Sequence, residues 1–381
     1  MVAFLLTLLV QSLLIPTTAT AAFSSAAAGN NPDVVVVRSY SLRDSGGRRI
    51  ATMQEVRPAP RDAPWTGEDE VESLYPTTRR AFVIPGDGAG PAGGAVANVR
   101  QTSFGCGRLG ATVWPSSIAL AALLSERADR GDGVGGGPAP VVGGRRVLEL
   151  GSGCGLPSAA ASILGASRVL ATDHWEEEGG GGDDRGRLMP KNPHGANLAH
   201  NVATLNRRRR PGGDGVGGGG EDFKDDPPVA SVRRLDWHDA SGARDVAGGY
   251  RPDLVIGSDL VYYPADVSPL LRTLGILLGE ATDREGGGGI GGGERRREAL
   301  LVSPLPPSAE RESLGEFRER LEAAADNRDV DDGWLAGCDV AMDELVMVER
   351  RGGDVDDDND DDDGEEERHN LLRIRIVQRP Y

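Results

Sequence analysis

Cysteine is scarce in this sequence, and the three cysteines of its 381 residues lie far apart. Cys106, Cys154 and Cys338 form no CxxC pair, and their number is odd. Such spacing suits neither a zinc site nor a disulfide framework, so we expect no bound metal and no covalent cross-link. Cys154 lies within a glycine-rich turn, where a small side chain packs well, and we expect it to serve packing and not nucleophilic chemistry.

An excess of positive charge is also absent. The 42 Lys and Arg residues against 59 Asp and Glu residues leave a formal net charge of -17, which argues against a general nucleic-acid binder. Eleven acidic residues and no basic ones lie in residues 354–367, so this tract alone supplies eleven of the seventeen excess negative charges. We expect a solvated surface insertion; the alternative is a docking site for basic partners.

Long hydrophobic segments are missing as well, apart from a short one at the N-terminus. The run FLLTLLVQSLLI at residues 4–15 is shorter than the roughly 20 residues of a membrane span, and a small-residue stretch follows it after Pro16. Residues 1–30 resemble a signal or transit leader cleaved near Ala22, although no basic segment precedes the apolar run. The leader predicts the secretory route or the plastid of an alga with secondary plastids, with a cytoplasmic protein as the alternative.

Glycine, by contrast, is abundant, with 55 residues. Runs at residues 179–182, 217–220 and 286–289 predict flexible insertions, which lengthen connections at a small entropic cost. The folded core is therefore expected to be shorter than the chain. The three expected regions are a leader, an N-terminal extension and one main domain, at residues 1–30, 31–130 and 131–381.

Strand-like and helix-like apolar segments alternate along the chain. Apolar residues at helical spacing predict helices at 116–124, with Pro115 in the first turn, and at 157–164, 197–205, 267–278 and 310–324. Short apolar runs predict strands at 146–150, 169–172, 230–235, 254–256, 299–303, 344–349 and 371–377. Such alternation indicates a mostly parallel sheet covered on both faces. The sequence thus predicts an α/β fold of the Rossmann-like, doubly wound type with seven strands and an antiparallel C-terminal hairpin, whose tip carries the acidic tract.

The loop after the first of these strands carries the strongest sign of a ligand site. Gly151, Gly153 and Gly155 lie between a strand and a helix, and glycine lets a backbone approach a ligand closely. Glu149 before the loop and Asp173 at the end of the next strand add two carboxylates at spacings suited to a nucleoside ligand. Asp173 can accept hydrogen bonds from both hydroxyls of a ribose. The alternative is a tight turn without a ligand.

The glycine spacing separates two classes of nucleoside cofactor. A dinucleotide loop has the pattern GxGxxG, whereas this loop is GxGxG, with Leu156 at the third glycine position of the dinucleotide pattern. The spacing suits a nucleoside cofactor that has no pyrophosphate. It therefore favours methyl transfer over the hydride transfer of an oxidoreductase.

Six segments in a fixed order give the sequence a family resemblance. They are VWPSSIAL at 113–120, VLELGSGCGL at 147–156, TDH at 172–174, NLAHNVATLN at 197–206, LDW at 235–237 and DLVIGSDLVYY at 253–263. With them the chain resembles the class I S-adenosylmethionine-dependent methyltransferases with a seven-strand sheet. Within this class it is similar to the methyltransferase-like protein-lysine methyltransferases of the family 16 type. The segment before Trp114 matches no motif of that group.

The resemblance implies S-adenosyl-L-methionine as the cofactor and a role for each matching residue. Asp173 would hold the ribose, Asp236 and Trp237 the adenine, and Trp114 would shape the entrance near the methionine end. The alternative for both tryptophans is core packing. The implied cofactor contacts are Trp114, Glu149, Gly151, Gly153, Gly155, Asp173, Asp236, Trp237 and Ser258.

Asp259 and Tyr262 fit the DxxY motif of the family, which implies the place where the acceptor amine enters. A lysine amine has a reference pKa of about 10.4 and must lose its proton before it attacks a methyl group. The implied partner is a protein lysine, with no nucleic acid and no stable membrane span. Competing predictions are a small-molecule N- or O-methyltransferase and a catalytically silent binding module, which the intact Asp259 and Tyr262 disfavour. The oligomeric state stays open.

Overall fold

The computed structural model describes the strands and helices of the chain and several of its connections. The leader, the glycine runs, Cys106 and the acidic tract up to residue 365 lie outside the described residues, so the predictions for them stay predictions. No helix within the described ranges is long and apolar enough to cross a bilayer. The described residues are 34–58, 77–85, 95–102, 109–126, 142–175, 193–209, 229–279, 297–305, 312–325, 335, 337–351 and 366–379.

Seven strands form the predicted doubly wound sheet, in the order β7-β6-β5-β8-β9-β11-β10. Strands β5 to β9 pair in parallel, and β11 is antiparallel to both β9 and β10. The α/β fold class and the antiparallel C-terminal hairpin are therefore confirmed. The bounds are β5 (Arg146–Leu150), β6 (Arg168–Asp173), β7 (Ala230–Arg234), β8 (Leu254–Ser258), β9 (Glu298–Pro304), β10 (Cys338–Arg351) and β11 (Glu366–Gln378).

Four N-terminal strands continue the same sheet beyond β10, in the order β4-β3-β2-β1-β10. Each of them is antiparallel to its neighbours, and β1 pairs with the half of β10 that extends past the parallel core. The sequence signals a strand only at the start of β1, where residues 34–37 are four valines. Their bounds are β1 (Val34–Asp44), β2 (Arg49–Pro58), β3 (Thr77–Ile84) and β4 (Ala95–Thr102).

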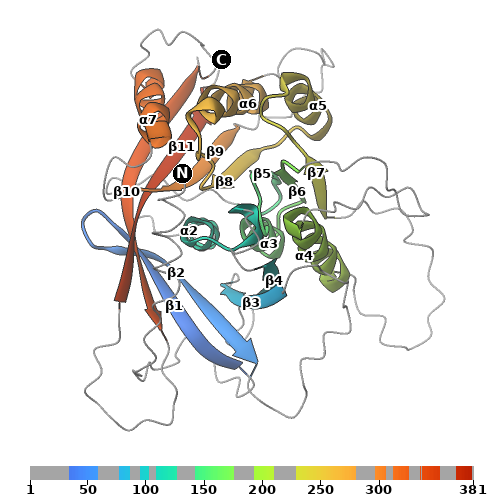
Figure 1. The fold of residues 1–381 in the computed structure, drawn as a ribbon, viewed down its shortest axis with the longest axis vertical. Helices are drawn as coiled ribbons and strands as arrows, with labels where there is room; N and C mark the ends of the chain where they lie inside the picture. Colours follow the sequence, from blue (N-terminus) through green and yellow to red (C-terminus); the bar gives the residue numbers. More distant parts are fainter. Residues whose placement is uncertain are drawn as a thin grey trace, which may run out of the picture.

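Helices cover both faces of the parallel strands (Figure 1). On one face α2, α3 and α4 lie between the parallel strands and the N-terminal strands, and on the other face lie α5, α6 and α7. Helix α5 was not predicted, because three glycines and three charged or polar residues interrupt its apolar pattern. The bounds are α2 (Pro115–Leu124), α3 (Leu156–Ile163), α4 (Pro193–Arg209), α5 (Ala240–Tyr250), α6 (Val267–Gly279) and α7 (Glu312–Ala325).

The expected N-terminal extension is part of the main core. Leu42 of β1 and Phe82 of β3 are fully buried, and they belong to one apolar cluster with Leu120 of α2 and Leu156 of α3. Burying such side chains contributes roughly 1.5 to 3 kcal/mol each relative to leaving them exposed. The boundary near residue 130 that the composition suggested therefore does not separate two cores.

A buried ionic cluster joins the first three strands. Glu55 of β2 accepts hydrogen bonds from the hydroxyl of Tyr40 at 2.8 Å and from Nε and Nη2 of Arg80 at 2.9 and 2.6 Å. The Arg80 guanidinium also lies 5.0 Å from the ring centroid of Phe82 and donates from Nη1 to the Val113 carbonyl at 3.4 Å. Burial raises the pKa of Tyr40 well above its usual range, so its hydroxyl stays protonated and donates.

Removing the carboxylate of this cluster should destabilise the whole fold. We expect Glu55→Ala to lower the free energy of unfolding by about 3 to 5 kcal/mol, because it leaves the buried Arg80 charge unpaired. Urea unfolding followed by both fluorescence and circular dichroism measures this loss. Asp44→Ala, which removes the exposed ion pair with Arg48, should have a far smaller effect. A separate early transition that involves β1 to β4 alone would contradict a shared core.

Candidate active site

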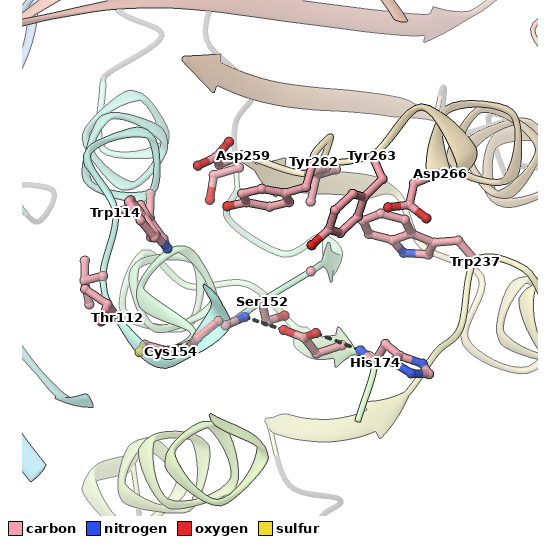
Figure 2. A pocket seen from close by; sticks show the side chains of 18 of the residues that line it. Thr112, Trp114, Ser152, Cys154, His174, Trp237, Asp259, Tyr262, Tyr263 and Asp266 are labelled. Atoms are coloured by element: carbon pink, nitrogen blue, oxygen red, sulfur yellow. Dashed lines mark hydrogen bonds between the residues drawn. The ribbon is translucent and has the colours of Figure 1, made fainter. Parts of the chain in front are cut away.

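A cavity of about 440 Å³ opens at the carboxyl ends of β5, β6 and β8, where strand order reverses in the sheet. Its volume lies within the usual range for small-ligand sites. The loops after these strands, the turn after β7 and the segment before α2 form its walls (Figure 2). Of the eleven residues predicted from the sequence, nine line it: Trp114, Gly151, Gly153, Asp173, Asp236, Trp237, Ser258, Asp259 and Tyr262.

Three loop glycines have left-handed backbone conformations that only glycine adopts readily. Their φ angles are 56° at Gly151, 51° at Gly153 and 75° at Gly155. Each is also tightly enclosed, since an added Cβ would lie 2.7 Å from Leu260 at Gly151 and 3.0 Å from the Gly110 carbonyl at Gly153. The turn therefore depends on glycine at these positions, independently of any ligand. Gly155 closes the turn at the N-terminus of α3 and does not line the cavity.

Glu149 does not line the cavity either, so we correct its predicted role. It is 1% exposed, and its Oε2 accepts hydrogen bonds from the backbone N–H of Ser158, at 3.0 Å, and from the Ser158 hydroxyl. A carboxylate in this place satisfies a free N–H in the first turn of α3. Glu149 thus holds the helix to the end of β5. Burial raises its pKa to about 8, and the hydrogen bonds from Ser158 oppose this shift.

Asp173 lies at the end of β6, directly beside the glycine loop. Its Oδ2 accepts a hydrogen bond from the Gly153 N–H at 2.6 Å, and its Oδ1 accepts one from the His174 N–H at 2.7 Å. Figure 2 shows both bonds below the cavity. They fix the carboxylate against the loop, and each carboxylate oxygen has a further acceptor position. Asp173 is therefore held at the cavity with its orientation set by two backbone amides.

Beyond Asp173, aromatic and acidic side chains form one end of the cavity. Asp236 accepts a hydrogen bond from the His238 N–H at 2.9 Å and lies 3.6 Å from Nδ1 of His174. His238 in turn lies 3.1 Å from Asp266, and both line the cavity with Trp237. The sequence analysis missed three of these residues. His174 and His238 could have been found because each directly follows a predicted site residue, Asp173 or Trp237. Asp266 lies in no motif that we identified.

The opposite side of the cavity carries the predicted acceptor residues. Asp259 and Tyr262 lie across the cavity from Ser152 and His174, and Trp114 lies on their other side at the start of α2 (Figure 2). Asp259 is 6% exposed and has φ of 50°, an uncommon conformation for a residue with a side chain. Tyr263, which was not predicted, also lines the cavity and is 58% exposed.

The charge of the cavity is negative. Four carboxylates line it, from Asp173, Asp236, Asp259 and Asp266, and none of the described lining residues is Lys or Arg. A pyrophosphate group would meet these carboxylates without a cation to balance it, whereas a sulfonium or ammonium group would be attracted. The electrostatics therefore agree with the glycine spacing in disfavouring a dinucleotide.

Residues 99–179, which contain the segment before α2, the glycine loop and Asp173, match the family described as lysine methyltransferase. This part of the chain is therefore similar to the lysine methyltransferase family. The human electron transfer flavoprotein beta subunit lysine methyltransferase is 43% identical over 63 residues, which cover 16% of this chain and 20% of the relative. A Yarrowia lipolytica protein named protein N-terminal and lysine N-methyltransferase EFM7 is 30% identical over 36% of this chain and 45% of its own length.

A third relative is similar over a longer stretch. The mouse protein-lysine methyltransferase METTL21E is 27% identical over 237 residues, 61% of this chain and 76% of the relative. The chain covers between a fifth and a half of the length of the first two relatives. Among solved structures, a ribosomal protein L11 methylase from Lactobacillus delbrueckii superposes with a TM-score of 0.32 at 14% identity, over 71% of this chain and 81% of that chain.

The buried Glu149 makes stability depend on pH. Its pKa is about 8 in the folded chain against an ordinary value of 4.5, so the folded chain holds a proton that the unfolded chain releases. The free energy of unfolding should therefore fall as the pH rises from about 5 to 8. Glu149→Gln keeps an acceptor for Ser158 and should flatten this slope in urea titrations at several pH values. Glu319→Gln, at an exposed position of α7, should leave the slope intact, and equal slopes in both variants would contradict the assignment.

Proposed function

We propose that this domain transfers the methyl group of S-adenosylmethionine to the ε-amino group of a protein lysine. The observation that carries the proposal is an acidic cavity built around the GxGxG turn and lined by Asp173, Asp259 and Tyr262. The lysine methyltransferases named among the relatives support a lysine acceptor. The leader adds the expectation of a secretory or plastid location, with the cytoplasm as the alternative.

The lining residues fit this cofactor. The backbone of Gly151 and Gly153 lines the cavity, so that a ligand can approach the turn closely, and Asp173 offers two acceptors to the ribose hydroxyls. Trp237 provides an aromatic face for the adenine, and Asp236 a polar contact beside it. When bound, the cofactor supplies an electrophilic methyl group on a positively charged sulfur. The carboxylates of the cavity balance that charge.

The residues across the cavity act on the acceptor. The carboxylate of Asp259 attracts a lysine ammonium, and the Tyr262 hydroxyl orients the amine by a hydrogen bond. The amine loses its proton before attack and presents its lone pair to the cavity. Because alignment supplies much of the rate enhancement in such a transfer, the positions of Asp259 and Tyr262 matter more than their acid strength. Trp114 limits access of water at this end.

The acceptor class is tested by incubating the purified protein with S-adenosylmethionine labelled in its methyl group and a total protein extract. We expect the label to appear in protein and to become soluble after protease treatment. Label in small molecules before proteolysis would instead indicate a small-molecule methyltransferase. Absence of label, together with tight binding of S-adenosylhomocysteine, would indicate a silent binding module. Binding of a nicotinamide dinucleotide in its place would contradict the class.

The two sides of the cavity should respond differently to mutation. Asp259→Asn, which tolerates the left-handed backbone, and Tyr262→Phe should each lower the single-turnover rate about 100-fold, or roughly 2.7 kcal/mol. Affinity for S-adenosylhomocysteine should change little in these variants, since they act on the acceptor. Asp173→Ala should weaken that affinity by about 1.5 to 3 kcal/mol.

Calorimetry and rapid-quench assays separate these two effects. Asp245→Ala, which removes an exposed carboxylate on α5, is the matched control and should change neither rate nor affinity. Unchanged rates together with collapsed affinity in the Asp259 and Tyr262 variants would place both residues in the cofactor wall and not at the acceptor.

A further inference from the structure

Asn201 of α4 connects the N-terminal strands to the glycine loop. Its Oδ1 accepts a hydrogen bond from the Arg100 N–H of β4 at 2.8 Å. Its Nδ2 donates to the Arg100 carbonyl at 3.0 Å and to the Cys154 carbonyl at 2.8 Å. The residue is 4% exposed, so these three bonds are shielded from water. One side chain thus holds an edge strand and the loop that lines the cavity.

On the strand side, the amide of Asn201 takes the place of a neighbouring strand. Among the described strands, β4 is the last of the sheet and pairs with β3 alone. The other edge of such a strand presents unpaired N–H and C=O groups, which must be satisfied when they are buried. The Asn201 amide offers one acceptor and one donor to Arg100, as a peptide group of a further strand would. The position of α4 relative to β4 is fixed in this way.

On the loop side, Asn201 fixes a peptide group within the turn. The Cys154 carbonyl belongs to the peptide that leads into Gly155, which has a φ of 75°. Earlier in the same turn, the Gly153 N–H donates a hydrogen bond to the Asp173 carboxylate. Cys154 Sγ also approaches the Gly110 carbonyl at 3.6 Å. The N–H of the same peptide, that of Gly155, donates to the Ser152 carbonyl at 2.6 Å. Without the Asn201 bond, the Cys154 carbonyl would lose this buried donor and the peptide would be held less firmly on its carbonyl side.

We propose that Asn201 is a positioning residue for cofactor binding, through which β4 and the glycine loop are coupled. This inference rests on the proposed function, because it assigns the loop to S-adenosylmethionine. Asn201 does not line the cavity itself and acts through Cys154 and its neighbours. Its contribution is therefore expected in cofactor affinity and not in the rate of methyl transfer once the cofactor is saturating.

The chain offers a matched control one turn earlier in the same helix. Asn197 is 2% exposed, and its Nδ2 has no hydrogen-bond partner among the described residues. Asn201→Ala should weaken S-adenosylhomocysteine binding at least about tenfold and raise the KM for the cofactor, with kcat within about twofold of the parent. Asn197→Ala removes a buried amide of equal size and should leave both constants near their parent values. Equal affinities in the two variants would overturn the proposal.

A second variant separates positioning from folding. Asn201→Asp keeps the shape of the side chain and an acceptor for the Arg100 N–H. In its ionised form, however, a carboxylate oxygen replaces the Nδ2 donor and faces the Arg100 and Cys154 carbonyls. Protonation restores one donor, so affinity for S-adenosylhomocysteine, relative to the parent, should recover as the pH falls. Asn201→Ala should show no such recovery. A pH-independent ratio for Asn201→Asp would contradict the proposal, and thermal melts at each pH confirm that the protein compared is folded.

Amide exchange in the unmutated protein gives a test that needs no variant. Addition of S-adenosylhomocysteine should slow exchange of the Arg100 N–H of β4 more than that of amides in β2. Equal effects on both strands would count against the coupling. Failure of the parent to bind S-adenosylhomocysteine would contradict the proposed function itself, whereas normal binding with no effect of Asn201→Ala would overturn this inference alone.

Discussion

The backbone of the turn between β5 and α3 constrains the rest of the site. A Cβ at Gly151 would lie 2.7 Å from Leu260, one at Gly153 would lie 3.0 Å from the Gly110 carbonyl, and one at Gly155 would lie 2.7 Å from Leu198. Three different parts of the chain therefore close on the turn at distances that only glycine permits. Because Leu260 and Gly110 also line the cavity, the geometry of the turn determines where these two walls lie.

The N-terminal strands belong to this arrangement, although no motif identifies them. The segment before α2 is attached to them by hydrogen bonds from the Thr112 hydroxyl to the Thr102 carbonyl at 3.0 Å and from the Val113 N–H to Gln101 Oε1 at 3.1 Å. Arg80 adds a bond to the Val113 carbonyl. Trp114 follows directly, so the position of this cavity wall depends on β3 and β4. A segment that looked like an extension thus shapes the candidate active site.

The sequence predicted the parallel strands and the glycine turn because both follow simple local rules. The other site residues were implied by the family resemblance. Buried parallel strands are short apolar runs, and the left-handed turn requires its glycines. The N-terminal strands do not follow such rules, since Glu55 and Arg80 break the apolar alternation and find their charged partners only in the folded chain. Glu149 was misplaced for a related reason: its partner, Ser158, is a small residue of the next helix that carries no recognisable signal.

The most direct test is a crystal structure of the protein with S-adenosylhomocysteine. The account predicts the adenine ring against Trp237, the ribose hydroxyls on the Asp173 carboxylate, and the sulfur directed to the side of the cavity that Asp259 and Tyr262 form. That orientation leaves an acceptor amine room between the two residues and the reacting sulfur. A ligand in the reverse orientation, or one bound outside this cavity, would contradict the assignment of the two sides of the site.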